Sequence, residues 1–189
     1  MKDLRSEAEV KTALRRIFAF AAGIDDPTDI VDTSNLYDPS PPKGDLGFAP
    51  PLVAMLIPLA ARELLGTKVV AVLGTSLLPP DLSTLSQFGP LALTLSDRFN
   101  RLGRRAIFLA VCKALERDPD SVTPSTTVAH PDEPGGLAFA ARLEHELKRS
   151  VCGNPKFAFT ESNRLAVIAA GNVGGLVDSV IDVIKKGCL

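Results

Sequence analysis

Two similar stretches of the chain, Asp26-Pro27-Thr28-Asp29-Ile30 and Asp118-Pro119-Asp120-Ser121-Val122, decide the fold. The first is followed by Thr33-Ser34-Asn35-Leu36 and the second by Ser125-Thr126-Thr127-Val128, so both lead into polar residues and then an aliphatic one. The second stretch begins at residue 118 and the first at residue 26, an offset of 92. A long pattern that returns at a fixed offset indicates a repeated structural unit.

A second pair of segments supports the same interpretation. Gln87-Phe88-Gly89-Pro90-Leu91 is matched by Asn172-Val173-Gly174-Gly175-Leu176 at an offset of 85, from 88 to 173. The sequence therefore predicts two diverged copies of one unit of about 85 to 95 residues. We expect the first domain over 1–100 and the second over 101–189.

Composition restricts the possible classes of protein. With 189 residues, 46% hydrophobic and 23% charged, the chain can bury one core or two small ones, so disorder is excluded. The formal net charge of −1 provides no general attraction to nucleic acid or to anionic lipid, and neither is expected as a partner. One basic cluster recurs at helical spacing and is interpreted as a solvated helix face; it consists of Arg98, Arg101, Arg104 and Arg105.

The cysteines and the apolar segments bear on location. Cys112, Cys152 and Cys188 are odd in number and lack C-x-x-C spacing, and Met1–Val10 is too charged for a secretory leader. We therefore predict a reduced, cytoplasmic protein. The longest apolar segment, 48–61, contains three prolines and is shorter than the roughly 20 residues that cross a bilayer, so no membrane span is expected.

Apolar periodicity predicts helices in the first half. Ser6 and Glu9 form a capping box before a helix over 7–22. A nearly uncharged helix follows over 52–65, in which Pro58 is expected to cause a kink or a division. The β-branched run 68–73 is expected to be irregular or a short helix, and a further helix is predicted over 81–102.

The second half repeats this order. The helix over 81–102 is expected to continue through Gly103 into an apolar helix over 106–115, which would fuse the two copies. An amphipathic helix is centred on 137–147, and two more are predicted near 162–170 and over 173–186. The prediction is an all-α protein made of two tandem four-helix bundles that share a long central helix.

The order of helices and loops resembles the acyl carrier protein family over about 8–99 and 105–186. In that family a Gly-x-Asp-Ser-Leu motif opens the second helix of a four-helix unit, and its serine receives phosphopantetheine. Gly44-Asp45-Leu46-Gly47-Phe48 is similar to the Asp-Leu-Gly before that serine, and 118–124 is similar to the end of the family's first helix. Val173-Gly174-Gly175-Leu176-Val177 is similar to the start of its last helix.

The position of the serine departs from the family. The resemblance aligns Pro50 with the serine in the first copy and Glu133 in the second, within Asp132-Glu133-Pro134. Neither residue has the hydroxyl nucleophile that attachment of the prosthetic group requires. The resemblance thus implies a carrier-like protein without a bound cofactor, which acts by binding another protein.

The surface expected to bind a partner lies on the two second helices. Several large aliphatic side chains of the helix over 52–65 would be costly to leave in water, so we expect the other unit or a second copy of the chain to cover them. Glu133 and the helix over 137–147 are then the surface left for a partner protein. Enzymes that normally meet carrier proteins are the partner class that the resemblance implies. The predicted interface residues are Leu52, Met55, Leu56, Leu59, Leu137 and Leu143.

No set of residues in the sequence predicts catalysis or a metal site. His130 and His145 lack metal-binding spacing with each other or with a cysteine. The segment 169–174 imitates a dinucleotide-binding turn but lacks the first glycine and the length of chain that must follow. Two alternatives stay open: an α/β enzyme or nucleotide-binding protein with strands at 68–73 and 165–168, and a carrier modified at an unexpected serine, Ser34 or Ser179.

Overall fold

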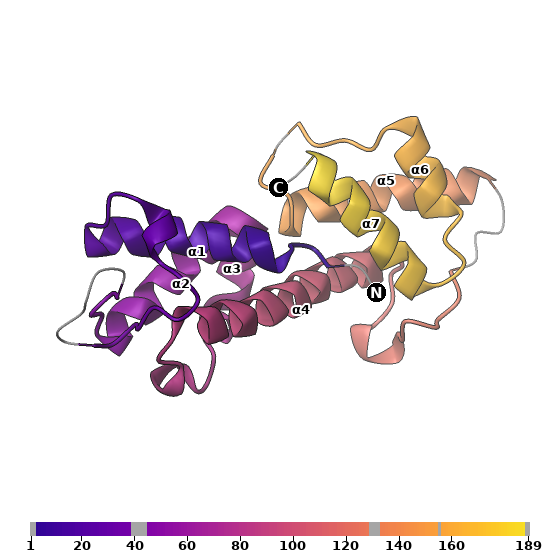
Figure 1. Cartoon of the computed structure of the whole chain (residues 1–189). Coiled ribbons are helices and arrows are strands. Elements are labelled where there is room, and N and C mark those ends of the chain that lie inside the picture. Colours follow the sequence, from indigo (N-terminus) through magenta and orange to yellow (C-terminus); the bar gives the residue numbers. More distant parts are fainter. Residues whose placement is uncertain (1–2, 39–44, 129–132, 155, 188–189) are drawn as a thin grey trace. The chain divides into compact units, whose positions relative to one another are not determined.

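The computed structural model describes residues 3–38, 45–128, 133–154 and 156–187, and over these residues the protein is helical (Figure 1). The only β-type pairings among them are two isolated bridges, so they form no sheet. The all-α prediction is confirmed. The α-helices are α1 (Glu7–Ala22), α2 (Pro50–Leu65), α3 (Thr67–Leu73), α4 (Phe88–Ala114), α5 (Glu133–Ser150), α6 (Glu161–Ile168) and α7 (Val173–Gly187).

The chain forms two compact units. The N-terminal unit is Arg5–Leu102, and the C-terminal unit is Gly103–Leu189 with Met1–Leu4. Helix α4 continues through Gly103, as predicted, and therefore supplies its first part to one unit and its second part to the other. In chain order each unit contains a long helix, a loop with a 3₁₀ turn, a second helix, a short helix and a last helix.

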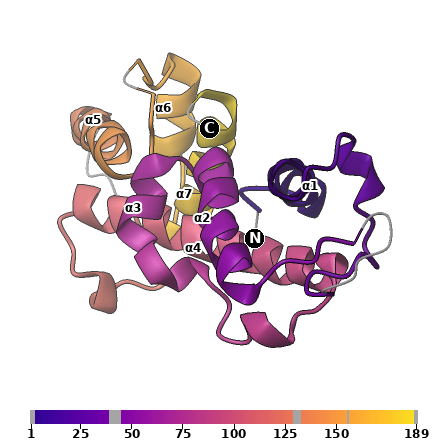
Figure 2. The same cartoon turned by 90° about the vertical axis from the view of Figure 1, so that its left-hand side faces the viewer.

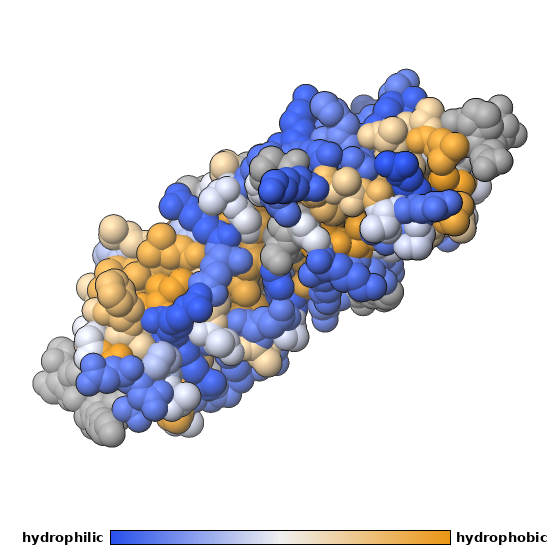
Figure 3. Space-filling view, turned by 90° about the horizontal axis from the view of Figure 1, so that it is seen from above, coloured by the Kyte–Doolittle hydropathy of each residue, from blue (hydrophilic) through white to orange (hydrophobic). Residues whose placement is uncertain are grey.

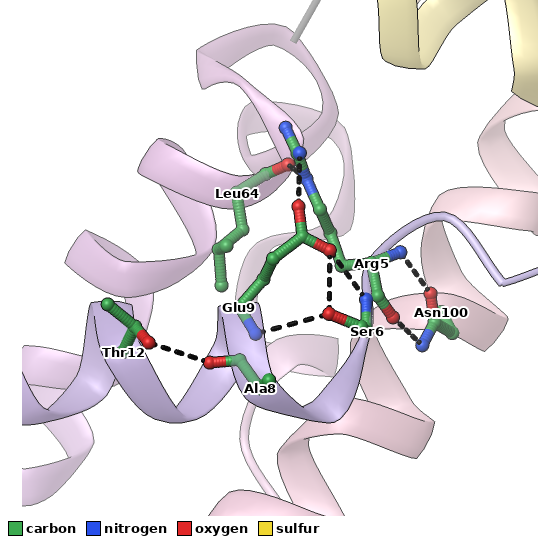
Figure 4. A network of polar contacts seen from close by, with 7 residues as sticks. All are labelled: Arg5, Ser6, Ala8, Glu9, Thr12, Leu64 and Asn100. Carbon is green, nitrogen blue, oxygen red and sulfur yellow. Dashed lines mark hydrogen bonds and ion pairs between the residues drawn. The ribbon is translucent and has the colours of Figure 1, made fainter.

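Local sequence sets both ends of α1. The Ser6 hydroxyl accepts a hydrogen bond from the Glu9 N–H, and the Glu9 carboxylate accepts one from the Ser6 N–H at 2.8 Å (Figure 4). This capping box satisfies two backbone donors that a helix start leaves without partners, and it lowers the pKa of Glu9. At the other end Gly23 adopts the left-handed conformation, with φ of 68°, which ends the helix.

Asn100 of α4 fixes the chain just before α1. Its side-chain oxygen accepts the Arg5 N–H at 2.8 Å, and its amide donates to the Arg5 carbonyl at 2.7 Å (Figure 4). The Arg5 guanidinium then reaches α2, where Nε donates to the Leu64 carbonyl at 2.8 Å. Because Asn100 is buried, it is the link that places the start of α1 against α4.

Replacing Asn100 should destabilise the N-terminal unit. Asn100→Leu leaves the Arg5 N–H and carbonyl without partners in a part-buried place, so we expect a loss of about 2 to 3 kcal/mol in the free energy of unfolding. Urea titration followed by Tyr37 fluorescence measures this loss, because Tyr37 is the one tyrosine of a chain without tryptophan and lies in this unit. A loss below about 0.5 kcal/mol would contradict the role assigned to Asn100.

The core of the N-terminal unit is built around Phe18 of α1. Its ring meets Phe48 at 5.6 Å and Phe88 at 6.1 Å between centroids, both edge to face. All three rings are buried, and the Arg15 guanidinium lies over the Phe88 ring, 5.4 Å from its centroid. This cluster joins α1, the segment before α2 and the start of α4.

Helix α2 packs against α1 and then against α3 (Figure 2). Pro58 has no N–H to donate to the turn before it, yet α2 remains one helix from Pro50 to Leu65. Of the two predicted outcomes, a kink or a division, the division is therefore wrong. Burial offsets the missing hydrogen bond, because seven side chains of α2 are buried; they are Val53, Leu56, Ile57, Ala60, Ala61, Leu64 and Leu65.

The loop after α1 is held by pairing with the residues before α4. Asp26 caps a 3₁₀ turn over Pro27–Asp29, and the chain then reaches an antiparallel bridge between Asn35 and Gln87. Leu36 N–H donates to Ser86 at 2.8 Å, Phe88 N–H to Ser34 at 3.0 Å, and Gly89 N–H to Asp32 at 2.8 Å, each to a carbonyl. This pairing explains why α4 begins at Phe88 and not at the predicted residue 81.

The loop of the C-terminal unit has the same hydrogen bonds at the offsets of the sequence repeat. Asp118 caps the 3₁₀ turn Pro119–Ser121, and the bridge joins Thr127 to Asn172. The equivalent bonds run from Val128 to Gly171 at 3.2 Å, from Val173 to Thr126 at 3.0 Å, and from Gly174 to Pro124 at 2.8 Å. Each donor and acceptor of these bonds therefore has its counterpart in the N-terminal unit, either 92 or 85 residues earlier in the chain.

The remaining helices of the C-terminal unit agree closely with their predicted ranges. Helix α5 contacts α6, and α6 contacts α7. Helix α5 begins at Glu133, so the loop before it is shorter than the predicted 118–136. Thr160 caps α6 by accepting the Asn163 N–H at 3.2 Å, and Asn172 accepts the Gly175 N–H at 2.8 Å near the start of α7.

Candidate functional site

The second helix of each unit begins at the residue that the family resemblance aligns with the modified serine. Pro50 is the first residue of α2, and Glu133 is the first residue of α5. Pro50 is exposed, and Ala49 before it makes no side-chain cap to the helix. The start of α2 therefore presents no hydroxyl. The side chain of Glu133, together with His130 and Asp132, lies outside the described residues.

The segment before α2 forms hydrogen bonds that hold the loop after α1 in place. The Asp45 carboxylate accepts the Asn35 N–H at 2.6 Å. The Leu46 N–H donates to the Asn35 carbonyl at 2.8 Å, and the Phe48 N–H to the Leu36 carbonyl at 2.6 Å. Asp45 thus has a structural role that does not depend on a cofactor. Gly44 of the same motif lies outside the described residues.

The predicted interface residues divide into exposed and buried ones. Met55 is 71% exposed and Leu59 45% on α2, and Leu137 is 46% exposed on α5. Leu52 is half-buried, while Leu56 and Leu143 are buried and present no surface to a partner protein. The exposed apolar surface is therefore narrower than predicted.

Phe20 is an exposed aromatic residue that the sequence analysis did not identify. Its side chain is 90% exposed, which is unusual for a phenylalanine. Its place in the sequence was the signal, because it does not belong to the three- and four-residue spacing of the buried face of α1; that face contains Val10, Leu14 and Phe18.

Glu144 of α5 serves the fold. Glu144 accepts the Phe159 N–H at 2.9 Å and a hydrogen bond from Lys148 at 3.0 Å. Burial opposes ionisation of Glu144, but these bonds outweigh it and lower its pKa, so the side chain is an anion that holds the segment before α6. His145 is exposed on the same helix, in agreement with its interpretation as a solvated residue.

The cysteines differ from one another. Cys112 is a buried free thiol, and burial raises its pKa, which makes it a poor nucleophile. Cys152 is disulfide-bonded, so the prediction of fully reduced cysteines is wrong there. The spacing of the cysteines in the sequence could not predict this disulfide, because a disulfide depends on which residues meet in space. Cys188 lies outside the described residues.

The basic cluster of α4 is largely engaged within the protein. Arg98 Nε donates to the Ser76 carbonyl at 2.7 Å. Arg104 forms an ion pair with Asp178 at 3.0 Å in the C-terminal unit. Arg105 lies over Phe108 at 5.4 Å, on its own helix. This pattern agrees with a helix face that has structural contacts.

The described residues contain neither a group that could hold a metal ion nor a strand. No three His, Cys, Asp or Glu residues among them are grouped so that they could hold a metal ion. The segment 165–168 lies in α6 and 68–73 lies in α3, so the alternative of strands at these places is wrong. The turn at 169–174 therefore joins two helices and lacks the strand that a dinucleotide site needs.

Comparisons with known proteins found no match to this chain. No family model matches the chain, no curated protein matches it, and no solved structure matches it. Over the part of the chain that the structure describes, no helix is long and apolar enough to cross a membrane.

Proposed function

We propose that this protein is a non-catalytic, acyl-carrier-like protein that cannot carry phosphopantetheine and acts by binding another protein. One observation carries the proposal. The two positions that the resemblance aligns with the modified serine are both the first residue of a second helix, and they hold Pro50 and Glu133. A helix start without a hydroxyl cannot accept the group.

The matched loops support the view that the two units are diverged copies. The 3₁₀ turn, the bridge and the three hydrogen bonds that follow recur in both units at the offsets found in the sequence. Each unit also has the helix order that is typical of carrier proteins. The tandem carrier-like architecture belongs to this proposal.

A binding function is favoured over an enzymatic one by what lies on the surface. The exposed large apolar side chains include Met55, Leu59 and Leu137, whereas the polar groups Asp45 and Glu144 are engaged in holding loops. Exposed apolar residues that gather on helices mark interaction sites. The proposed partner class is an enzyme that recognises carrier proteins.

A cytoplasmic location is a prediction from the number and spacing of the cysteines. The disulfide at Cys152 counts against it, because reducing compartments rarely keep disulfides.

The lack of modification can be tested by intact-mass measurement. After incubation with coenzyme A and a phosphopantetheinyl transferase of broad specificity, we expect the mass of the protein to stay unchanged, because neither second helix begins with a hydroxyl. An authentic carrier protein in the same tube is the positive control. A mass increase of one phosphopantetheine group would overturn the proposal, and peptide mapping would then locate the modified residue.

The second candidate, a carrier modified at another serine, is weakened by the surroundings of those residues. Ser34 is 3% exposed and its hydroxyl accepts the Val31 N–H at 2.9 Å, so it is closed to an enzyme. Ser179 lies within α7, only partly exposed, and not at a helix start. A Ser179→Ala variant serves as the control if any mass increase is found.

A further inference from the structure

An exposed apolar surface of the N-terminal unit contains Phe20 of α1 with Met55 and Leu59 of α2. These side chains are 90%, 71% and 45% exposed. We call these three residues the α1/α2 patch. Figure 3 shows apolar side chains gathered on the face of the molecule seen from above.

The ion pair between Arg16 and Glu63 brings the two halves of the patch together. Arg16 on α1 contacts Glu63 on α2. Residues four apart lie one above the other on a helix, so Phe20 is one turn beyond Arg16, and Leu59 is one turn before Glu63. Met55 is one turn before Leu59, nearer the start of α2. The patch therefore continues along both helices from the same ion pair.

The two helices run in opposite directions at this surface. Arg5, just before α1, bonds to Leu64 near the end of α2. Phe18, near the end of α1, contacts Phe48, just before α2. The end of α1 and the start of α2 therefore lie at the same end of the patch.

The patch has ends of opposite charge and an uncharged middle. From Pro50 to Ala61, α2 has no charged residue. Arg62 is exposed at the end of the patch where α2 finishes. Asp25 and Asp26 are exposed just beyond α1, at the opposite end. A surface of this kind complements a copy of itself that is turned to run in the opposite direction.

We propose that the α1/α2 patch is a self-association surface, on which a second copy of this chain packs about a twofold axis with its α2 antiparallel. This inference rests on the proposed protein-binding function and assigns this one surface to a second copy of the chain. In this arrangement Met55 of one copy faces Leu59 of the other. Arg62 of each copy lies beside Asp25 of the other.

The size of the patch fits the centre of a modest interface. A buried aromatic side chain removes about 150–250 Å² from water, and Phe20 offers most of that area. Two aliphatic side chains add to it, while a standard interface needs about 800 Å² from each partner. The patch therefore supplies the apolar core, and the charged ends supply the polar rim.

Size-exclusion chromatography with light scattering tests the association. Each chain has a mass of 20.0 kDa, and we expect the natural protein to approach twice this mass at high concentration. Leu59→Asp should weaken association at least about tenfold, because it places a charge in the apolar centre. The matched control is Leu93→Asp, since Leu93 on α4 is 50% exposed, close to the value for Leu59, and lies outside the patch. The control should associate as the natural protein does.

A charge exchange tests the orientation. Asp25→Lys and Arg62→Glu should each weaken association about two- to tenfold, because each variant places like charges together at both ends of the interface. The variant with both changes restores opposite charges and should recover association. A merely unfolded or sticky variant would not be rescued in this way.

A natural protein that stays monomeric over the dilution series would overturn the inference. So would dissociation by Leu93→Asp equal to that by Leu59→Asp, or the failure of the double charge exchange to recover association. These results are independent of the proposed lack of phosphopantetheine modification, which the intact-mass measurement tests separately.

Discussion

Phe18→Ala should destabilise the N-terminal unit by about 3 to 5 kcal/mol. The ring is fully buried and lies edge to face with two other phenylalanines, Phe48 and Phe88. Its removal therefore opens a cavity where three segments of the chain meet, and edge-to-face contacts worth about 0.5 to 1.5 kcal/mol each are lost with it. Urea titration followed by Tyr37 fluorescence measures the effect in the unit that contains the cavity.

Phe20→Ala is the matched control. It removes the same atoms from the same helix, but the side chain of Phe20 is 90% exposed. We expect a change within about 0.5 kcal/mol. Both variants are compared in a Leu59→Asp background, which keeps self-association out of the measurement. Equal losses for the two variants would contradict the assignment of Phe18 to the core.

Gly89→Ala should cost the same unit about 1 to 3 kcal/mol. A Cβ at this position would lie 2.9 Å from both the Cβ and the carbonyl oxygen of Asp32, which is closer than real side chains come. The Gly89 N–H also donates to that carbonyl at 2.8 Å, so relief of the clash would break the bond. Alanine favours a helix over glycine by about 0.5–1 kcal/mol, but this gain is smaller than the loss.

Gly174 and Gly171 in the C-terminal unit leave more space for a Cβ than Gly89 does, so the three alanine variants can be compared. A Cβ on Gly174 would lie 3.1 Å from the Pro124 carbonyl oxygen, whereas a Cβ on Gly171 would meet nothing within 4 Å. We expect Gly174→Ala to cost less than Gly89→Ala and Gly171→Ala to be nearly neutral, by urea titration followed with circular dichroism. A neutral Gly89→Ala would show that the contact with Asp32 does not constrain the loop.

The parts of the fold that depend on neighbouring residues could be predicted from the sequence. The range of α1 follows from the capping box of Ser6 and Glu9 and from Gly23 at its end, and the structure has that range. The helix through Gly103 follows from its apolar periodicity. These features are local, so the sequence contains all the information that they need.

Features that depend on distant residues were missed or misplaced. Residue 81 has the periodicity of a helix, but Gln87 pairs with Asn35, and this pairing delays α4 to Phe88. Leu143 has the same residue type as Leu59, yet Leu143 is buried and Leu59 is not. The disulfide at Cys152 likewise depends on which residues meet in space.

For the candidate site, the sequence identified the positions but not the exposed surface around them. The family register pointed to Pro50 and Glu133, where α2 and α5 begin, whereas the apolar periodicity alone began these helices later, at 52 and after 136. The exposure of Phe20 depends on how α1 packs against α2, which the spacing of apolar residues along one helix cannot define.

The continuity of α4 has a consequence for how the gene for this protein can be divided. A cut at the border between the units would fall inside an uninterrupted run of hydrogen-bonded turns, from Phe88 to Ala114. The N-terminal fragment would then end in four backbone carbonyls without helical partners, and the C-terminal fragment would begin with four N–H groups without them. Fragments meant for separate expression should therefore overlap, so that each one contains the whole of α4.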